Sequence, residues 1–505
     1  MKRRRDRGTG CGARAAALVA AGLVAAVPAG PAEAGTPPAV AQEVSRIEAG
    51  GGTVGLLAQD LDGRVLFAHA PDRPLVPAST MKLLTTACAL ERLGPAWTVA
   101  TEVLADGRLD PSGHLRGTLW IRGGGDPLLR VEDLWALTRE LHALGLRRVE
   151  GLGVDPGLFT GPPVPASWPG RPVRDPYAAP QGAASLAWNS LELVVRPGAR
   201  PGAPAEVALF PFPGGVRIVN RARTGGTTEL DIRLNTAKDR PAQVTIGGTI
   251  AAGAAPYREW IRLGDPARAL LGVFRGLLGQ AGITVAGQDR IGPVPAGARS
   301  VTRRLGRPLA EIVRAVNKYS SNFGAEVLLR HLGALRDPPQ RSTAAGLSVL
   351  GDCLQAWGVA RRGLVLADGS GYAPADRLTA RALVTVLEHA ARDPRWGPEL
   401  VVSLPRAGED GSLRNRLADL RGTVRAKTGS LARVATLAGL LARPGRPAVA
   451  FAILVNGQRR IPRESADRLL RALARDLESG RLPASSGSRR PERGVAVGDA
   501  PDAPR

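Results

Sequence analysis

The chain has 505 residues, of which 44% are hydrophobic and 22% charged, and its formal net charge at pH 7 is +23. Because a disordered chain lacks the apolar content needed to offset the entropy of folding, this composition indicates a folded globular protein. The length corresponds to two to four domains, so a single small module is excluded.

The positive charge comes almost entirely from arginine, since only five of the 68 basic residues are lysines. Together with the many Ala, Gly and Pro residues, this bias most simply reflects nucleotide composition. No basic run has interleaved aromatic residues, so we expect no nucleic-acid partner. A cationic surface would favour contact with anionic envelope polymers, and the alternative is an Arg-rich surface that is merely solvated.

Residues 1–34 have the features of a secretory signal peptide. A basic segment precedes an apolar stretch from Ala15 to Val27, and a small-x-small site follows at Ala32-Glu33-Ala34. We expect cleavage after Ala34 and export to a periplasm, the cell wall or the extracellular space. The apolar stretch is too short to span a bilayer, so the mature chain is expected to have no transmembrane span; an uncleaved anchor is the alternative.

Two cysteines, Cys88 and Cys353, remain after cleavage at this site. The chain contains no CxxC pair and no Cys/His spacing typical of zinc ligands, so we predict no metal site and no cofactor. The two cysteines could form a disulfide, but the sequence cannot place their Cα atoms within bonding range. Two buried free thiols are the interpretation that we favour.

The first elements expected along the chain are two strands and a helix. Residues 52–70 read as two strands joined at Asp62-Gly63, a strong hairpin signal. A helix is expected to open at residues 77–79 and to stop at Gly94. Short β-rich runs broken by Gly and Pro follow, and the first long amphipathic helix is expected only at residues 266–279. We therefore predict an inserted, mostly β region at residues 99–305, as one unit or as two nested subdomains.

Helical patterns return at residues 309–336, 342–357 and 379–392, and strands are expected at 423–427, 434–441 and 448–455. A closing helix is predicted at residues 465–477. The fold class is α/β in the α+β sense: an antiparallel sheet, with two strands from the N-terminal part and three from the C-terminal part, flanked by helices. Residues 35–98 and 306–480 would form this domain, and residues 481–505 a disordered tail.

Familiar catalytic motifs are missing from the sequence. None of the five histidines lies in a recognisable catalytic motif, and HExxH, the GxxxxGK[ST] loop and the GxSxG elbow are absent. These absences argue against a zincin, a P-loop enzyme and an elbow-type hydrolase. A nucleophile in this protein would be activated by a residue other than histidine.

Lysine is the candidate activator, because an amine can lose its proton at working pH whereas a guanidinium cannot. Three of the lysines lie in polar clusters, at residues 79–82, 317–322 and 427–429. In the first cluster, Ser79 and Lys82 are three residues apart on one helical face, so Lys82 can reach the Ser79 hydroxyl and act as its base. The alternative is a capping serine and a surface lysine.

The other two clusters each have a structural alternative as well. Ser320 and Asn322 precede a predicted helix, where capping would explain them. Lys427-Thr428-Gly429 closes a predicted strand, where Lys427 and Thr428 could bind a carboxylate, or simply end the strand.

The ordered occurrence of an SxxK helix, an SxN loop and a KTG strand is the motif set of penicillin-binding proteins and serine β-lactamases. With Gly123-Gly124-Gly125-Asp126-Pro127, Asp368-Gly369-Ser370-Gly371 and the loop from Leu404 to Gly411, the chain resembles the S13 family of D-alanyl-D-alanine carboxypeptidases and endopeptidases. The resemblance runs from about Gly52 to Glu478. It implies a serine β-lactamase/transpeptidase-like domain with a large insertion.

The resemblance also implies roles for individual residues. Ser79 would be the acylated nucleophile, Lys82 its base, and Ser320 and Asn322 the proton relay and substrate-amide contact. Backbone amides of Ser79 and Ser430 would form the oxyanion hole. The terminal carboxylate would be bound by the strand residues Lys427, Thr428, Gly429 and Ser430. Asp155 is a further candidate, for a basic side chain of the substrate, whereas Asp368 and Asp410 are interpreted as loop and turn residues.

The expected function is hydrolysis of D-Ala-D-Ala bonds, or D-Ala cross-links, in peptidoglycan stem peptides, with β-lactams as covalent inhibitors. A serine β-lactamase is one rival, although we find no clear ExxLN-type loop carrying a deacylating carboxylate. A non-catalytic peptidoglycan-binding scaffold is the other rival. The intact polar clusters argue against it, because a binding protein needs no activated nucleophile.

Overall fold

The computed structural model describes residues 38–170, 175–210, 216–235, 242–336 and 338–482. The predicted signal peptide and nearly all of the predicted tail lie outside these residues. Within the described part of the chain, no helix is both long enough and apolar enough to cross a membrane.

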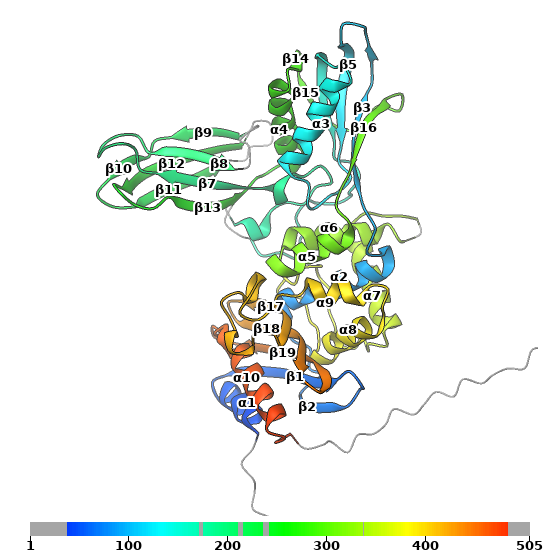
Figure 1. Cartoon of the computed structure of the whole chain (residues 1–505), viewed down its shortest axis with the longest axis vertical. Coiled ribbons are helices and arrows are strands. Elements are labelled where there is room, and N and C mark those ends of the chain that lie inside the picture. Colours follow the sequence, from blue (N-terminus) through cyan, green and yellow to red (C-terminus); the bar gives the residue numbers. More distant parts are fainter. Residues whose placement is uncertain (1–37, 171–174, 211–215, 236–241, 337, 483–505) are drawn as a thin grey trace, which may run out of the picture. The chain divides into compact units, whose positions relative to one another are not determined.

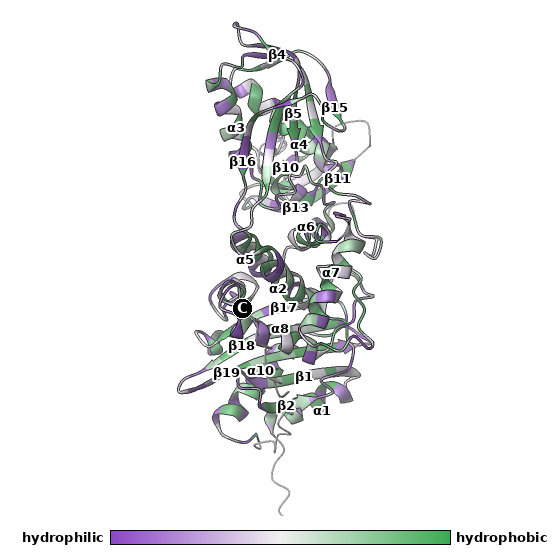
Figure 2. Cartoon of the chain, turned by 90° about the vertical axis from the view of Figure 1, so that its right-hand side faces the viewer, coloured by the Kyte–Doolittle hydropathy of each residue, from purple (hydrophilic) through white to green (hydrophobic). Residues whose placement is uncertain are grey.

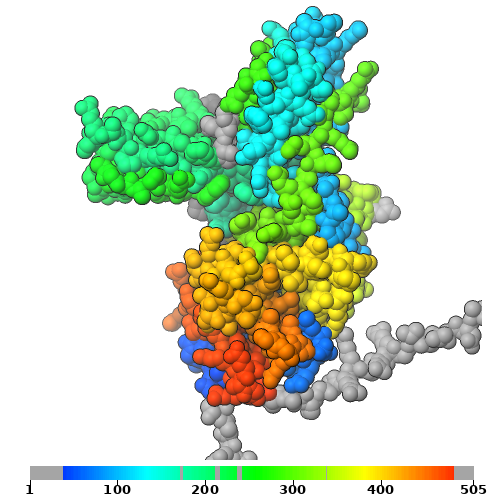
Figure 3. Space-filling view, in the orientation of Figure 1, coloured from blue at the N-terminus to red at the C-terminus, as the bar shows by residue number. Residues whose placement is uncertain are grey.

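The first and last parts of the chain build one five-stranded antiparallel sheet, in the order β17-β18-β19-β1-β2 (Figure 1). Its strands are β1 (Gly52–Asp60), β2 (Val65–His69), β17 (Val424–Leu431), β18 (Val434–Arg443) and β19 (Arg446–Gly457). The predicted sharing of strands between the two ends of the chain is thus confirmed. In the space-filling view, the blue N-terminal and the orange-to-red C-terminal residues accordingly share one part of the surface (Figure 3).

Helices cover both faces of this sheet, which explains why its strands are apolar on both sides. Leu56 faces a core formed with α1 and α10, and its neighbour Leu57 faces a core formed with the other helices. The helices of this part are α1 (Ala39–Ala49), α2 (Met81–Leu93), α5 (Leu309–Tyr319), α6 (Asn322–Gly333), α7 (Thr343–Ala356), α8 (Ala380–Arg392), α9 (Gly397–Ser403) and α10 (Glu464–Glu478). Helix α1 lies before residue 52, where no element was expected from the sequence.

The helical pattern predicted from 309 to 336 is interrupted at Ser320. This residue adopts the left-handed conformation, with φ 57° and ψ 40°, and so ends α5. Helix α6 then starts at Asn322, with Ser321 as its N-cap: the Ser321 hydroxyl accepts a hydrogen bond from the Gly324 amide. The break places the SxN residues in a tight turn between two buried helices.

The described residues between α2 and α5 form three further sheets. One, of order β14-β6-β5-β3-β16 with β4 and β15 beside it, packs against two helices (Figures 1 and 2). Its elements are β3 (Ala100–Ala105), β4 (Arg108–Leu109), β5 (His114–Arg122), α3 (Val131–Ala143), β6 (Arg148–Asp155), α4 (Pro266–Gln280), β14 (Thr284–Val285), β15 (Asp289–Ile291) and β16 (Arg299–Leu305). The expectation that the insertion contains no long helix before residue 266 is wrong, because α3 forms the crossover between the parallel strands β5 and β6.

Two smaller sheets share a separate apolar core. Their orders are β13-β7-β8 and β10-β12-β11, with β9 paired to β12. The strands are β7 (Ser190–Arg196), β8 (Glu206–Phe210), β9 (Val216–Asn220), β10 (Arg223–Gly225), β11 (Glu229–Asn235), β12 (Ala242–Ala251) and β13 (Tyr257–Arg262). The sheet of β5 and β6 and the two smaller sheets thus have separate apolar cores, and the boundaries of the insertion at residues 99 and 305 stay a prediction.

The cysteines differ from the sequence interpretation. Cys88 on α2 and Cys353 on α7 are joined by a disulfide, with their Cα atoms 6.0 Å apart. The prediction of two buried free thiols is therefore wrong. Both residues are fully buried as expected, but the packing of α2 against α7 brings them within bonding range.

Candidate active site

Ser79 lies in a single turn of 3₁₀ helix, η1 (Ala78–Thr80), that leads directly into α2. The carbonyl oxygen of Pro77 anchors this turn, accepting hydrogen bonds from the hydroxyls of Thr80, at 2.6 Å, and of Thr436 on β18, at 2.8 Å. The turn is therefore fixed to the sheet, with Ser79 only partly buried at the start of the helix.

Lys82, one turn further along, is fully buried. Its amine donates to the Ser79 hydroxyl at 2.9 Å, to the Asn322 side-chain oxygen at 2.7 Å and to the Ser370 carbonyl at 2.7 Å. Burial lowers the pKa of Lys82 to about 8, although the charge of Asp368 acts in the opposite direction. The amine beside the Ser79 hydroxyl can therefore lose its proton near neutral pH.

The turn between α5 and α6 contributes Ser320 and Asn322. Since Ser321 is the residue that caps α6, capping does not explain its two neighbours. The Asn322 amide donates to the Tyr177 carbonyl at 3.0 Å while its oxygen accepts from Lys82, so the side chain is held at both ends. The Ser320 hydroxyl accepts from the amine of Lys427 at 2.9 Å.

Lys427 lies in β17 and is fully buried. Its amine also donates to the Thr428 carbonyl at 2.8 Å. Burial lowers the pKa of Lys427 well below its ordinary value, and the nearby charges of Lys82 and Arg416 lower it further. The two lysines thus flank one centre: Lys82 bonds Ser79 and Asn322, and Lys427 bonds Ser320.

The remaining strand residues lie beside the nucleophile. A Cβ at Gly429 would meet the Thr436 hydroxyl at 2.1 Å and the Ser79 amide nitrogen at 3.0 Å, so only glycine lets β17 run this close to the serine. Thr428 shares a 2.7 Å hydrogen bond between its hydroxyl and that of Ser412. Ser430 follows in the strand, opposite Ala435 of β18.

A loop that includes Asp368 supplies one contact of Lys82. The Asp368 carboxylate accepts hydrogen bonds from four backbone amides, those of residues 370–373, and from the indole of Trp168 at 2.8 Å. It is thus a loop residue, and the loop that it shapes presents the Ser370 carbonyl to Lys82. The Asp-Gly-Ser-Gly motif is visible in the sequence, but no local pattern identifies Ser370, or the Tyr177 carbonyl, as a contact of the site.

Two candidates lie outside this centre. The Lys318 amine contacts both oxygens of Asp410 at 2.8 Å, which joins α5 to the loop before β17. Asp155, at the end of β6, accepts from the amides of Gly157 and Val294 and pairs with Arg122 at 3.5 Å. All three partners of Asp155 belong to the region between β2 and α5, and its contact with a substrate side chain stays a prediction.

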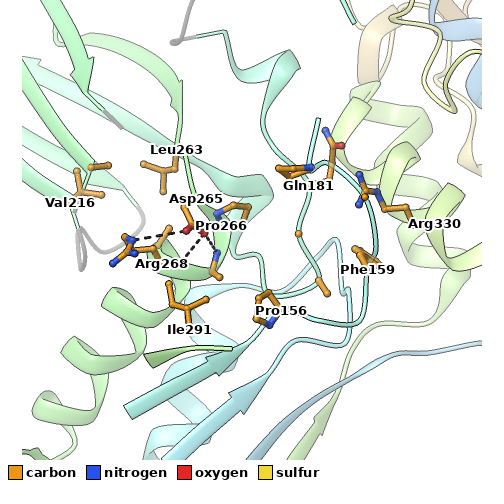
Figure 4. A pocket seen from close by; sticks show the side chains of 18 residues that line it. Pro156, Phe159, Gln181, Val216, Leu263, Asp265, Pro266, Arg268, Ile291 and Arg330 are labelled. Atoms are coloured by element: carbon orange, nitrogen blue, oxygen red, sulfur yellow. Dashed lines mark hydrogen bonds and ion pairs between the residues drawn. The ribbon is translucent and has the colours of Figure 1, made fainter. Parts of the chain in front are cut away.

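A pocket of about 610 Å³ lies next to the start of α4 (Figure 4). The residues that line this pocket include Phe159, Gln181 and Asp265, together with Arg330 of α6. The wall contains none of the serine, asparagine and lysine side chains described above. The pocket is therefore separate from the candidate catalytic centre.

Comparisons with known proteins agree with this geometry. The sequence model of the D-Ala-D-Ala carboxypeptidase 3 (S13) family matches residues 39–475. A D-alanyl-D-alanine carboxypeptidase of Actinomadura sp. (strain R39) is 34% identical over 417 residues, covering 78% of this chain and 76% of that protein. The D-alanyl-D-alanine carboxypeptidase DacB of Haemophilus influenzae is 24% identical, over 81% of this chain and 86% of that protein.

Among solved structures, penicillin binding protein 4 (dacB) of Haemophilus influenzae superposes with a TM-score of 0.75 at 22% identity. The match covers 87% of this chain and 99% of that one. A second structure of the same protein, in complex with a β-lactam, gives a TM-score of 0.71. The predicted fold class is confirmed by this likeness.

Proposed function

The chain belongs to the S13 family of D-Ala-D-Ala carboxypeptidases, and from this premise we propose that it hydrolyses the terminal D-Ala-D-Ala bond of peptidoglycan stem peptides through an acyl-enzyme on Ser79. The observation that carries the proposal is the fully buried Lys82 amine, 2.9 Å from the Ser79 hydroxyl. A general base must lie within hydrogen-bond reach of the proton that it removes, and its pKa should lie near the working pH. Lys82 meets both conditions.

In the proposed acylation, neutral Lys82 takes the hydroxyl proton as the Ser79 oxygen attacks the carbonyl carbon of the scissile bond. The negative charge that develops on the carbonyl oxygen would be stabilised by the backbone amides of Ser79 and Ser430. As the C–N bond breaks, the departing D-alanine amine takes up the proton that Lys82 accepted, which returns Lys82 to its neutral form. Ser320, which is bonded to Lys427, is the proposed relay for this proton. Water then attacks the ester, with Lys82 again as base, and frees Ser79.

Substrate binding is proposed for the residues around the nucleophile. Asn322 would contact the peptide amide, since its side chain lies between Lys82 and the Tyr177 carbonyl. Lys427, Thr428 and Ser430 would bind the terminal carboxylate, with Gly429 allowing the strand to approach. An endopeptidase reaction on a D-Ala cross-link would use the same acyl-enzyme, with a different amine as leaving group.

Penicillin would acylate the same serine, because opening of the β-lactam ring also transfers an acyl group to Ser79. Intact-mass spectrometry tests this: wild type should gain the mass of one penicillin, and Ser79→Ala none. Ser348→Ala, which removes an exposed serine of α7, is the matched control and should label fully. An adduct on Ser79→Ala would refute the assignment.

The lifetime of the label distinguishes the rival functions. A stable adduct indicates a penicillin-binding peptidase, rapid turnover indicates a β-lactamase, and absence of label indicates a scaffold. Export through residues 1–34 to the cell envelope, and contact of the cationic surface with anionic envelope polymers, also belong to the proposal.

A further inference from the structure

Glu326 is a buried acidic residue that the mechanism above does not use. It lies on α6 one turn after Asn322, so the two side chains share one face of the helix. The residue is fully buried, and its Oε1 atom accepts a hydrogen bond from the backbone amide of Gly369 at 2.9 Å. Burial of a carboxyl group costs free energy of folding unless hydrogen bonds or nearby charges compensate for the lost hydration.

The partner of Glu326 belongs to the segment that supports Lys82. The Gly369 amide donates to Glu326, and the Gly369 carbonyl accepts from the Thr85 hydroxyl at 2.6 Å. The next carbonyl, that of Ser370, accepts from the Lys82 amine at 2.7 Å. Helices α6 and α2 thus hold the Gly369–Ser370 segment, and this segment gives Lys82 one of its three acceptors.

Glu326 also interacts electrostatically with Lys82. Burial, together with the charge of Asp368, raises the pKa of Glu326 to about 8, although the hydrogen bond from Gly369 and the Lys82 ammonium act in the opposite direction. Arg330, on the next turn of α6, is a second cation that interacts with Glu326. On the lysine, the charges of Asp368, Glu326 and Asp376 all favour the ammonium form. Lys427 is the cation that opposes it from β17.

We propose that Glu326 is a positioning residue of the acylation step: it fixes the Gly369–Ser370 segment against Lys82, and in its ionised form it favours the ammonium form of that lysine. The proposal rests on the proposed function, because it assigns Glu326 an effect on the base of Ser79. Glu326 would touch neither the substrate nor the reacting atoms. Its charge would instead set the pH above which Lys82 can accept the Ser79 proton.

Glu326→Gln separates the two effects, because the amide keeps the size and the acceptor oxygen but carries no charge. The measurement is the second-order rate of penicillin acylation between pH 5 and 10. Without the anion, Lys82 loses its proton more easily, so the rising limb of the profile should move to lower pH. Glu326→Asp keeps the charge but shortens the side chain away from Gly369. We expect the rising limb of the Glu326→Asp profile to lie at the wild-type pH, and its plateau rate to be lower than that of wild type.

Glu388→Gln is the matched control. Glu388 is a buried glutamate on α8 that accepts a hydrogen bond from the Gln59 side chain. The rising limb of the Glu388→Gln profile should coincide with that of wild type. An unmoved limb in Glu326→Gln, or the same movement in Glu326→Asp, would overturn the proposal. Failure of the wild type itself to acylate would instead overturn the proposed function, so the two outcomes are distinguishable.

A second measurement follows the titration of the Glu326 carboxyl itself, with this residue unchanged. Interaction between two ionisable groups is reciprocal, so removing the Lys82 cation must raise the pKa of Glu326. In carbon-13 spectra of glutamate labelled at the carboxyl carbon, one resonance of wild type should titrate near pH 8. In Lys82→Met the same resonance should titrate at higher pH. An unmoved titration of this resonance in Lys82→Met would overturn the coupling.

Discussion

Gly371 lies against the backbone of Ala78, the residue that precedes the nucleophile. A Cβ at Gly371 would stand 1.8 Å from the Ala78 carbonyl oxygen, and Gly371 has a φ of +76°. Ala78 itself has a positive φ of 45°. The loop that presents the Ser370 carbonyl to Lys82 therefore packs directly on the turn that presents Ser79.

We expect Gly371→Ala to lower the rate of penicillin acylation by about 10²-fold, because a displacement of the Ser79 turn of even 1 Å would misalign the nucleophile. Gly358→Ala is the control: its φ is +71°, but a Cβ there meets nothing within 4 Å. Both variants pay the cost of a left-handed alanine, about 1 kcal/mol. Equal acylation rates in the two variants, measured on folded protein, would show that the Gly371 contact has no effect on Ser79.

Lys82→Arg tests whether Lys82 acts as a base. Because the pKa of Lys82 is about 8, wild-type acylation should rise as the pH increases through this value and the amine becomes neutral. A guanidinium stays protonated, so Lys82→Arg should lose about 10²- to 10⁴-fold in rate, nearly as much as Lys82→Ala. Near-normal acylation by the arginine variant would show that Lys82 supplies only positive charge.

Part of this site is predictable from sequence because it depends on local geometry. In a helix, residues three apart share a face, which brings Lys82 to Ser79 without knowledge of the rest of the fold. The apolar strand segments near the two ends of the chain likewise indicate the shared sheet. The pairing of Lys427 with Ser320 is different, since 107 residues separate them and only the complete motif set indicated a common centre.

Other features depend on packing that no local pattern encodes. The Ser370 carbonyl reaches Lys82 across 288 residues, and only because Gly371 lets the loop approach Ala78. Glu326 reads in the sequence as one more polar residue of a helix, and its burial follows from the packing of α6 against α2. The disulfide between Cys88 and Cys353 depends on the packing of α2 against α7 in the same way.

His331 should make the protein less stable in mild acid. This fully buried residue accepts a hydrogen bond from Arg341 at Nδ1, at 3.0 Å, so Nε2 carries the hydrogen donated to the Gly125 carbonyl at 2.8 Å. Burial lowers the pKa of His331 from 6.5 to about 4. The unfolded chain therefore binds more protons between these pH values, and stability falls as the pH drops through this range, by ~3 kcal/mol in all.

Thermal melting from pH 8 to pH 4 measures this effect. His331→Gln can keep the hydrogen bond to Gly125 but cannot become charged, so its melting temperature should fall less than that of wild type below pH 6.5. Half-buried His142 is the control position, since His142→Gln should stay closer to the wild-type curve than His331→Gln does. If the melting temperatures of wild type and His331→Gln fall in parallel as the pH is lowered, protonation of His331 does not cause the loss of stability.

The disulfide should stabilise the domain that contains Ser79. It closes a loop with a sequence separation of 265 residues, and removal of such a bond typically costs about 2–5 kcal/mol. We expect a double Cys88→Ala, Cys353→Ala variant to melt several degrees below wild type. Alkylation of the unfolded mature protein should label no cysteine without reductant and two cysteines with it. Two labelled thiols in the absence of reductant would restore the free-thiol interpretation.

Lys427 differs from Lys82 in what its amine contacts. Among the described residues it donates hydrogen bonds to the Ser320 hydroxyl and the Thr428 carbonyl, and none to Ser79. Its pKa is lowered, chiefly by burial. A bound carboxylate would favour the ammonium form, so ligand binding should be accompanied by proton uptake at a pH where the free amine is neutral.

Lys427→Arg should therefore retain far more activity than Lys427→Ala, in contrast to the arginine variant at position 82. A guanidinium can replace an ammonium as the partner of a carboxylate, although its planar fork fits a site built for a point charge imperfectly. We expect Lys427→Ala to lose about 10²-fold in acylation rate, chiefly with carboxylate-bearing ligands. The measurement compares penicillin and a D-Ala-D-Ala peptide with the same ligands esterified at the carboxylate. Equal losses for arginine at positions 82 and 427, or no dependence on the ligand carboxylate, would show that the two lysine roles are wrongly assigned.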